Sequence, residues 1–290
     1  MTSFIFRTIR IVVPDSEAPA MHRFRVSSGT CTFDCTNDGK RYEAEARVPR
    51  HPWSCLTGPE SKPIASPDLT FDPATTLWIV SLPPHLLHPL GRFKELLGQD
   101  GVGAVLNDPT QRLAIAALVE HTTTSYCTAR TGLKIQGVAV RDRGQITTTI
   151  DPQKQARIGI HLDSWDRLPI SQRGAARNRL NVNLGAGNRH LLFAARSVME
   201  MAEDLDANEC LNQHPTGLVR EWLRINPDEP IYDLTIRPGE AYIAPTEVLP
   251  HDSSTEGKTH VDVSLTLLGH FNGGAVESRL GTAFTRRVGQ

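Results

Sequence analysis

The stretch Arg157-Ile-Gly-Ile-His-Leu-Asp-Ser-Trp165 decides how the rest of the chain is interpreted. Three apolar residues alternate along it, at Ile158, Ile160 and Leu162. Such alternation is typical of a strand with one buried face. Because successive side chains of a strand point to opposite faces, His161 and Asp163 would project together from the second face. A histidine and a carboxylate placed in this way can occupy two neighbouring positions on a metal ion.

A second histidine, further along the chain, would complete the ligand set. After a Pro238-Gly239 turn the chain continues through a short apolar strand, residues 241–244, and then reaches His251. Two histidines and one carboxylate leave three open positions on an octahedral metal, which favours Fe(II) with oxygen chemistry. We therefore expect His161, Asp163 and His251 to be the metal ligands and to form the catalytic centre.

The His-x-Asp pattern occurs twice, so the pattern alone does not identify the ligands. The second copy is His260-Val-Asp262, close to the end of the chain. Its one later histidine, His270, follows too soon for the intervening strands that a barrel needs. The first copy has room for those strands, so we prefer it and interpret Asp262 as a chance match.

The chain is expected to form a single domain of mainly β structure with flanking helices. Prolines separate short alternating pieces in the first 75 residues, which favours short strands and long loops. We expect residues 1–132 to cover a barrel, residues 133–271 to form its core, and residues 272–290 to be a tail. The clearest helix is capped by Asp108, has proline at its first position and runs to about Tyr126.

Short strands and two helical inserts are predicted along most of the remaining chain. The strands are expected at residues 77–82, 134–140, 146–150, 157–163, 179–184, 190–194, 231–236, 241–244 and 261–268. The inserts are expected at residues 195–204 and 217–224. Many short strands separated by Gly, Pro and Asp turns are typical of a sandwich or barrel with helices packed outside.

Composition favours a small-molecule substrate. The 31 Lys and Arg nearly balance the 32 Asp and Glu, whereas nucleic-acid binders usually carry a clear basic excess. No apolar run approaches the ~20 residues of a membrane span, and Arg7 and Arg10 interrupt the apolar start, so a cytoplasmic location is expected. The five cysteines are odd in number and scattered. Cys31 and Cys35 lack a second pair at zinc-ligand spacing, so we expect reduced thiols. Nothing in the pattern indicates an oligomeric state.

The order of these motifs resembles the Fe(II)/2-oxoglutarate-dependent oxygenase superfamily. The resemblance rests on the His-x-Asp strand, a strand with polar inward positions, Pro-Gly-Glu and the distal histidine. Residues 177–185 are similar to the core strand that follows the metal motif in aspartyl/asparaginyl and proline hydroxylase-like members. The resemblance covers about residues 133–271. It implies a double-stranded β-helix, the jelly-roll or cupin-like core, with Fe(II) as cofactor and 2-oxoglutarate and O2 as co-substrates.

The resemblance also implies a class of reaction. Members of the superfamily hydroxylate or desaturate an unactivated carbon of the substrate, here a small molecule and, by analogy, an amino acid or a peptide-like metabolite. Halogenation is disfavoured because that chemistry usually replaces the carboxylate ligand with a small residue, and Asp163 is present.

One position departs from the family pattern. Many members carry an arginine about ten residues beyond the distal histidine, where it pairs with the 5-carboxylate of 2-oxoglutarate, but Asp262 stands there in this chain. A carboxylate cannot hold another carboxylate without a shared proton. The first candidate for the missing cation is Arg179, which shares one strand face with Asn181 and Asn183 and could form a bidentate clamp. The second candidate is Lys258.

Two other functions stay open. A metal-dependent cupin enzyme that does not use 2-oxoglutarate is compatible with the missing arginine. A non-catalytic jelly-roll binding module would use the histidines and the aspartate only as structural residues. Three more arginines could meet an anionic group of a substrate, although solvated side chains are the simpler interpretation: Arg167, Arg173 and Arg189.

Overall fold

The computed structural model describes residues 2–6, 8–14, 20–33, 39–56, 72–205 and 214–273. Cys35 lies outside these ranges, and so does the tail from residue 274 onward. Cys31 is described and is a free cysteine, whereas the interpretation of Cys35 and most of the expected tail fall outside the described structure.

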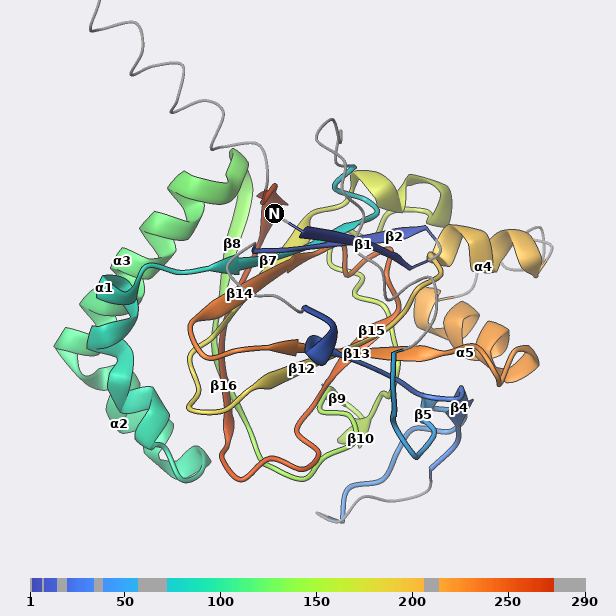
Figure 1. Cartoon of the computed structure of the whole chain (residues 1–290), viewed down its shortest axis with the longest axis horizontal. Coiled ribbons are helices and arrows are strands. Elements are labelled where there is room, and N and C mark those ends of the chain that lie inside the picture. Colours follow the sequence, from blue (N-terminus) through green and yellow to red (C-terminus); the bar gives the residue numbers. More distant parts are fainter. Residues whose placement is uncertain are drawn as a thin grey trace, which may run out of the picture.

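Seven strands form the larger of two main sheets (Figure 1). Their spatial order is β1 (Thr2–Phe6), β2 (Ile9–Val13), β7 (Thr76–Ser81), β14 (Glu240–Ala244), β11 (Asn178–Asn183), β16 (Asp262–Phe271) and β8 (Cys127–Arg141). Neighbouring strands are antiparallel except β2 and β7, which are parallel. The sheet therefore joins strands from the start, middle and end of the chain.

Five strands form the second main sheet. Their order is β15 (His251–Ser254), β12 (Arg189–Ala194), β13 (Ile231–Ile236), β3 (Phe24–Val26) and β6 (Ser54–Cys55), all antiparallel. Two small hairpins lie apart from it, β9 (Ile150–Asp151) with β10 (Ala156–Arg157) and β4 (Thr30–Cys31) with β5 (Val48–Pro49). Early strands therefore contribute to both main sheets.

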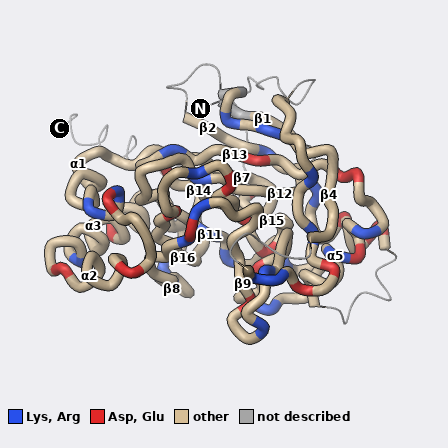
Figure 2. Tube along the Cα trace, turned by 90° about the horizontal axis from the view of Figure 1, so that it is seen from below, with Lys and Arg blue, Asp and Glu red and all other residues tan. Residues whose placement is uncertain are grey.

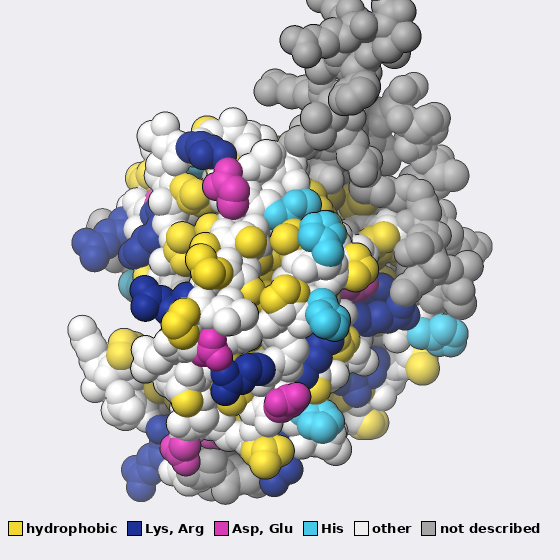
Figure 3. Space-filling view, turned by 90° about the vertical axis from the view of Figure 1, so that its left-hand side faces the viewer, with side chains coloured by type: hydrophobic (Ala, Val, Ile, Leu, Met, Phe, Trp, Pro, Cys, Tyr) yellow, Lys and Arg dark blue, Asp and Glu magenta, His cyan; other side chains and the backbone are white. Residues whose placement is uncertain are grey.

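Helices cover the outer faces of both main sheets (Figure 1). Helices α1 (Pro84–Leu87), α2 (Val102–Asn107) and α3 (Pro109–Tyr126) lie on the larger sheet, and α4 (Val198–Asp204) and α5 (Pro215–Ile225) lie on the smaller one. Short 3-10 helices span Ala20–Arg23, His88–Glu95, Gln99–Gly101 and Ile170–Ala175. Figure 3 shows apolar, charged and histidine side chains intermixed over the surface of the α1–α3 side. The result is a four-layer arrangement of helix, sheet, sheet and helix.

The space between the two sheets is filled by aromatic and aliphatic side chains. Phe6 of β1, fully buried, contacts Tyr232 of β13 with ring centroids 4.8 Å apart in an edge-to-face arrangement. Phe24 and Phe193 extend this cluster. Full burial of a phenylalanine contributes roughly 1.5–3 kcal/mol. Early strands are therefore part of the central core.

Alternation along the strands separates this inner space from the helix layers. On β11, Leu180 and Val182 pack in the cluster under α1–α3, which leaves Arg179, Asn181 and Asn183 on the opposite, inner face. On β12, Leu191 and Phe193 face the inner cluster, whereas Leu192 and Ala194 face α4 and α5. The shared face predicted for Arg179 and the two asparagines is observed.

The predicted strands agree with the structure where the pattern is regular and disagree where it is not. β13 has the predicted bounds, and α3 has the predicted end. The continuous strand expected at residues 157–163 is wrong, because only β10 and a single bridge at His161 form. Gly159 breaks it: its φ is +73° and an added Cβ would lie 2.5 Å from the carbonyl oxygen of Arg47.

Other expected elements shift or were missed. The strand expected at residues 146–150 is reduced to β9, and β8 begins at Cys127, directly after α3, without a turn signal. β15 was not predicted because its His-Asp-Ser-Ser sequence is polar, although it pairs with β12 over four residues. His251 is thus the first residue of β15 and does not end the preceding apolar strand.

Acidic and basic residues are interspersed over the strands and helices (Figure 2). Several pairs are buried, among them Arg23, which donates to both carboxylate oxygens of Glu240 at 2.7 Å. Among the described residues, no helix combines the length and apolar character needed to cross a membrane.

We expect that deleting residues 1–75 produces an aggregating or unfolded protein. The deletion removes β1 and β2 from one sheet and β3 and β6 from the other, together with Phe6 and Phe24 of the inner cluster. Size-exclusion chromatography and thermal melting followed by circular dichroism measure the effect. A soluble truncation with a cooperative melting transition would instead identify this region as an independent appendage.

Candidate metal centre

Two chain segments far apart in sequence hold the three predicted ligands. His161 donates its backbone N–H to the carbonyl oxygen of His251 at 3.0 Å, and His251 donates back to His161 at 2.8 Å. This exchange makes them a directly opposed antiparallel pair, so both side chains leave the pair on the same side. Two residues further on, the N–H of Asp163 donates to the carbonyl oxygen of Thr246 at 3.0 Å. Backbone pairing therefore brings all three side chains together.

The three side chains form a compact, buried group. One nitrogen of each histidine and one oxygen of Asp163 lie within 4.8 Å of one another. The two imidazole rings are tilted by 37° with centroids 4.9 Å apart, so the rings are not stacked. The prediction that His161, Asp163 and His251 meet is confirmed, and the group could hold a metal ion.

The hydrogen bonds of the imidazoles leave one nitrogen on each ring for a metal. Nδ1 of His161 donates to the carbonyl oxygen of Gly159 at 2.8 Å, and Nδ1 of His251 donates to that of Leu249 at 2.9 Å. This arrangement places the proton on Nδ1 and the lone pair on Nε2. Nε2 of His251 is buried and has no hydrogen-bond partner among the described residues. A metal ion would satisfy this atom, so the residues fit a metal.

The surroundings of His251 and Asp163 favour their metal-binding protonation states at neutral pH. Burial lowers the pKa of His251 to about 3, and the attraction of Asp163 offsets only part of this shift. Burial alone would raise the pKa of Asp163, but its polar surroundings, above all the charge of Arg179, outweigh burial and lower that pKa. A carboxylate and a neutral imidazole are the forms that bind divalent metals.

Arg179, the first candidate for a 2-oxoglutarate clamp, lies against a metal ligand. Its Nη2 is 2.6 Å from Oδ2 of Asp163, and both side chains are largely buried. Burial lowers the pKa of Arg179, but Asp163 and Tyr242 raise it by more, so the guanidinium stays charged. In this position Arg179 fixes the orientation of the carboxylate. Nε of Arg179 is buried without a partner among the described residues.

The two asparagines beside Arg179 differ in their contacts. Asn181 donates from Nδ2 to Oγ1 of Thr266 at 2.7 Å, and its buried Oδ1 has no partner in the described part of the chain. Asn183 instead bonds to the backbone of the following turns, donating from Nδ2 to Gly187 and Ile236 and accepting from the N–H of Gly185. These contacts make Asn183 a residue that stabilises the turns, whereas Oδ1 of Asn181 is free to accept a hydrogen bond from a ligand.

Asp262 is not part of the metal group. Its Oδ1 accepts from Nζ of Lys258 at 2.7 Å, and its Oδ2 is paired with Arg189. Burial would raise the pKa of Asp262, but these two cations outweigh it and lower that pKa. His260 of the same motif is exposed. The structure agrees with the interpretation of this motif as a chance match to a metal pattern. Asp262 is nevertheless part of a buried ion-pair cluster with Arg189 and Lys258.

The cations near Asp262 outnumber it. Arg189 is on the inner side of β12, on the same face as Leu191, and Lys258 is in the loop after β15. Arg141, which is opposite Asp262 in the β8–β16 pairing, adds a third positive charge. Sequence reasoning did not identify this cluster, because Arg189 and Asp262 belong to different sheets. In the sequence, the one sign of this cluster is that Arg189 and Asp262 both occupy inward-facing positions of strands with alternating polarity.

Arg173 was expected to be solvated, and this interpretation is wrong. Its side chain is 1% exposed, and Nη1 donates to the carbonyl oxygens of Asp163 at 2.9 Å and Glu247 at 3.2 Å, while Nη2 donates to Oγ of Ser164 at 2.8 Å. The guanidinium therefore links the segment that carries Asp163 to the segment before His251. No sequence pattern could reveal this link, since it bridges two loops.

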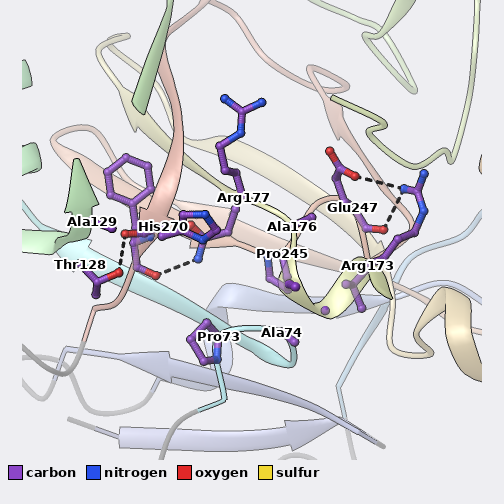
Figure 4. A pocket seen from close by; sticks show the side chains of 15 residues that line it. Pro73, Ala74, Thr128, Ala129, Arg173, Ala176, Arg177, Pro245, Glu247 and His270 are labelled. Atoms are coloured by element: carbon purple, nitrogen blue, oxygen red, sulfur yellow. Dashed lines mark hydrogen bonds and ion pairs between the residues drawn. The ribbon is translucent and has the colours of Figure 1, made fainter. Parts of the chain in front are cut away.

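A hollow of about 260 Å³ lies beside these loops (Figure 4). Pro73 and Ala74 are on one side of it, and His270 and Thr128 are on another. The paired side chains of Arg173 and Glu247 stand at one end. Its walls therefore combine the N-terminal region with the ends of the larger sheet.

Comparison of the chain with protein-family models, with curated proteins and with solved structures finds no match.

We expect that replacing His161 or Asp163 with alanine abolishes tight binding of Co(II), used as an air-stable probe of the site, because each change removes one ligand. The Asp262→Asn variant should retain the metal affinity of the unaltered protein. Equilibrium dialysis and the visible absorption of bound Co(II) measure both. Loss of metal by Asp262→Asn together with retention by Asp163→Ala would show that the second His-x-Asp motif holds the metal.

Proposed function

We propose that this chain is an Fe(II)- and 2-oxoglutarate-dependent oxygenase built on a double-stranded β-helix. The strand order supports the fold: from β8 onward one sheet receives β8, β11, β14 and β16, and the other receives the 161–163 segment, β12, β13 and β15. The chain changes sheet at every step except between β12 and β13. In this winding each sheet receives four antiparallel segments. The N-terminal strands would then extend the edges of the two sheets.

The buried group of His161, Asp163 and His251 carries the proposal. Two imidazoles and one carboxylate on one side of a metal leave positions for a co-substrate and oxygen, which is the ligand set of non-haem Fe(II) oxygenases. When bound, iron and 2-oxoglutarate would supply the oxidising chemistry. The protein's own residues keep His251 neutral and Asp163 ionised, place Arg179 against Asp163, and keep the group buried.

The cluster around Asp262 supports use of a co-substrate with a second carboxylate. Arg189 and Lys258 share the one carboxylate of Asp262, and Asp252 and Asp233 act on Arg141 and Lys258 in addition. Nε of Arg189 is buried and has no partner among the described residues. This group could donate to a further carboxylate, so Arg189 with Lys258 is the proposed receptor for the 5-carboxylate in preference to Arg179.

The proposed reaction is hydroxylation, or desaturation, of an unactivated carbon in a small molecule such as an amino acid or a peptide-like metabolite. The near-neutral charge of the chain supports a small-molecule substrate over nucleic acid. A cytoplasmic location is part of the same proposal. Retention of Asp163 favours hydroxylation over halogenation.

A metal-dependent cupin enzyme without 2-oxoglutarate is the second candidate. It is favoured by two observations: Asp262 replaces the family arginine, and Arg179 is engaged by Asp163. Such an enzyme would bind its substrate directly at the metal. A non-catalytic module would bind no metal. Release of succinate on addition of 2-oxoglutarate separates the first candidate from the other two.

We expect Arg189→Met and Lys258→Met to weaken 2-oxoglutarate binding to the Co(II)-loaded protein without lowering its Co(II) affinity. Loss of one partner of a buried charged pair costs about 2–5 kcal/mol, which is some tens to thousands of fold in the dissociation constant. Isothermal titration under argon measures both affinities.

Arg23→Met is the matched control, because it breaks a buried arginine–carboxylate pair, with Glu240, outside both sites. A larger effect of Arg179→Met than of Arg189→Met would assign the clamp to Arg179. Undiminished 2-oxoglutarate binding in all three clamp variants, or none in the unaltered protein, would favour the cupin alternative.

A further inference from the structure

A second hollow, of about 650 Å³, lies beside the loop that follows Asp163. Its polar lining comes from Ser164, Arg167, Arg173 and His214, and its apolar lining comes from residues 168–170 and Pro215. We call it the rim pocket. Its volume is in the range of pockets that hold small metabolites, and its mixed lining suits a ligand with one polar end and an apolar body.

The rim pocket is one residue away from a metal ligand. Ser164, in its wall, directly follows Asp163 in the chain. Arg173, also in its wall, donates from Nη1 to the carbonyl oxygen of Asp163 at 2.9 Å. The rim pocket therefore adjoins the backbone of the segment that carries Asp163.

The charged groups of the rim pocket are cationic. Arg167 and Arg173 line it, and no acidic side chain is among the lining residues that the structure describes. Arg173 is ion-paired with Glu247 at 3.5 Å (Figure 4), but Glu247 does not line the pocket. Its Nε is buried without a hydrogen-bond partner in the described chain, although the side chain is 1% exposed.

The remaining polar groups of the pocket are hydrogen-bond donors. Nδ1 of His214 accepts from the N–H of Thr216 at 3.3 Å, so a neutral ring carries its proton on Nε2. Burial and the charges of Arg173 and Arg220 lower the pKa of His214, which keeps the ring neutral at pH 7. Oγ of Ser164 accepts from Arg173 and keeps its own O–H to donate. His214 also caps the N-terminal, positive end of α5.

The backbone at Arg167 is held in an uncommon conformation. Its φ is +53°, a left-handed value that costs a non-glycine residue free energy, and the strain is kept although the side chain is exposed. The turn at this residue places a cation on the pocket wall.

We propose that the rim pocket binds the carboxylate of a small organic acid whose apolar body packs against Leu168, Ile170 and Pro215. A site that offers only donors and positive charge selects a group that only accepts, and a carboxylate is such a group. A free α-ammonium group would meet two arginines and no acidic partner. The ligand is therefore an acid without that ammonium, such as an N-acyl amino acid or a peptide C-terminus.

Calling this acid the substrate rests on the proposed oxygenase function. The proposal that the rim pocket binds the acid does not depend on that function. The test uses the full-length, metal-free protein and three probes of one shape: N-acetyl-L-leucine, N-acetyl-L-leucinamide and L-leucine. Ligand-observed NMR and isothermal titration should show millimolar or tighter binding of the acid. Binding of the amide and of the free amino acid should be weaker by about tenfold or more. The amide lacks the charged carboxylate, and the ammonium group of the amino acid is repelled by the arginines.

Arg167→Gln should weaken binding of N-acetyl-L-leucine by about tenfold, and His214→Gln should weaken it to a smaller extent. Arg112→Gln, a change at an exposed arginine on α3, is the matched control and should have no effect. Arg173 is not used, because its replacement would also disturb the loops that hold Asp163.

Equal binding of the acid and the amide, no binding of the acid at millimolar concentration, or an unaffected Arg167→Gln variant would each overturn the proposal. These outcomes are independent of the metal and 2-oxoglutarate titrations. If the acid fails to bind but both titrations succeed, the pocket assignment is wrong and the oxygenase proposal stands. If the acid binds and the titrations fail, the pocket is a carboxylate site of a protein with another function.

Discussion

The backbone pair between His161 and His251 is the interaction on which the rest of the site depends. Its two hydrogen bonds join a loop-like segment after β10 to the first residue of β15, and they fix both imidazoles on one side. Asp163 then reaches the same side because strand side chains repeat every two residues. Each Nδ1 is tied to a nearby carbonyl oxygen, so neither ring can rotate freely. The protein itself thus fixes the geometry of three side chains that could hold a metal ion.

Buried charge is organised around this pair in separate, locally compensated groups. Asp163 faces Arg179, and Asp262 faces Arg189 and Lys258 from the opposite side. A buried charge without a partner is costly, so each carboxylate stabilises the cations next to it. Two places differ from this pattern: Arg189 and Lys258 share the one carboxylate of Asp262, and the described lining of the rim pocket holds two arginines and no acidic side chain. We propose both places as carboxylate sites for that reason.

The layers of the fold supply the rigidity that such a site requires. Leu180 and Val182 of β11 pack under the helices, and this packing holds Arg179 and Asn181 towards the inner space. The aromatic cluster of Phe6, Phe24 and Tyr232 holds the two sheets together. The N-terminal strands are therefore structurally inseparable from the core that positions the ligands. Arg173 adds a direct link between the two ligand segments.

The sequence by itself determined the features that depend on local periodicity. Alternation predicted β11, β12 and β13 and the shared face of His161 and Asp163, and the Asp-Pro cap predicted α3. The match with His251 could be inferred because a 2-His-1-carboxylate set requires one more histidine at a suitable distance. Each of these inferences uses either residues that are close in the chain or the number of ligands that a metal site of this type requires.

Only the tertiary structure decided which partners the buried charged groups have. Arg179 was expected to serve a co-substrate and lies against Asp163, while Asp262, interpreted as a chance match, is paired with Arg189 from the other sheet. Arg173 was interpreted as solvated and is buried between two loops. The physical reason is that the burial and charge of a side chain depend on what packs against it from distant segments, and periodicity within one strand carries no information about that.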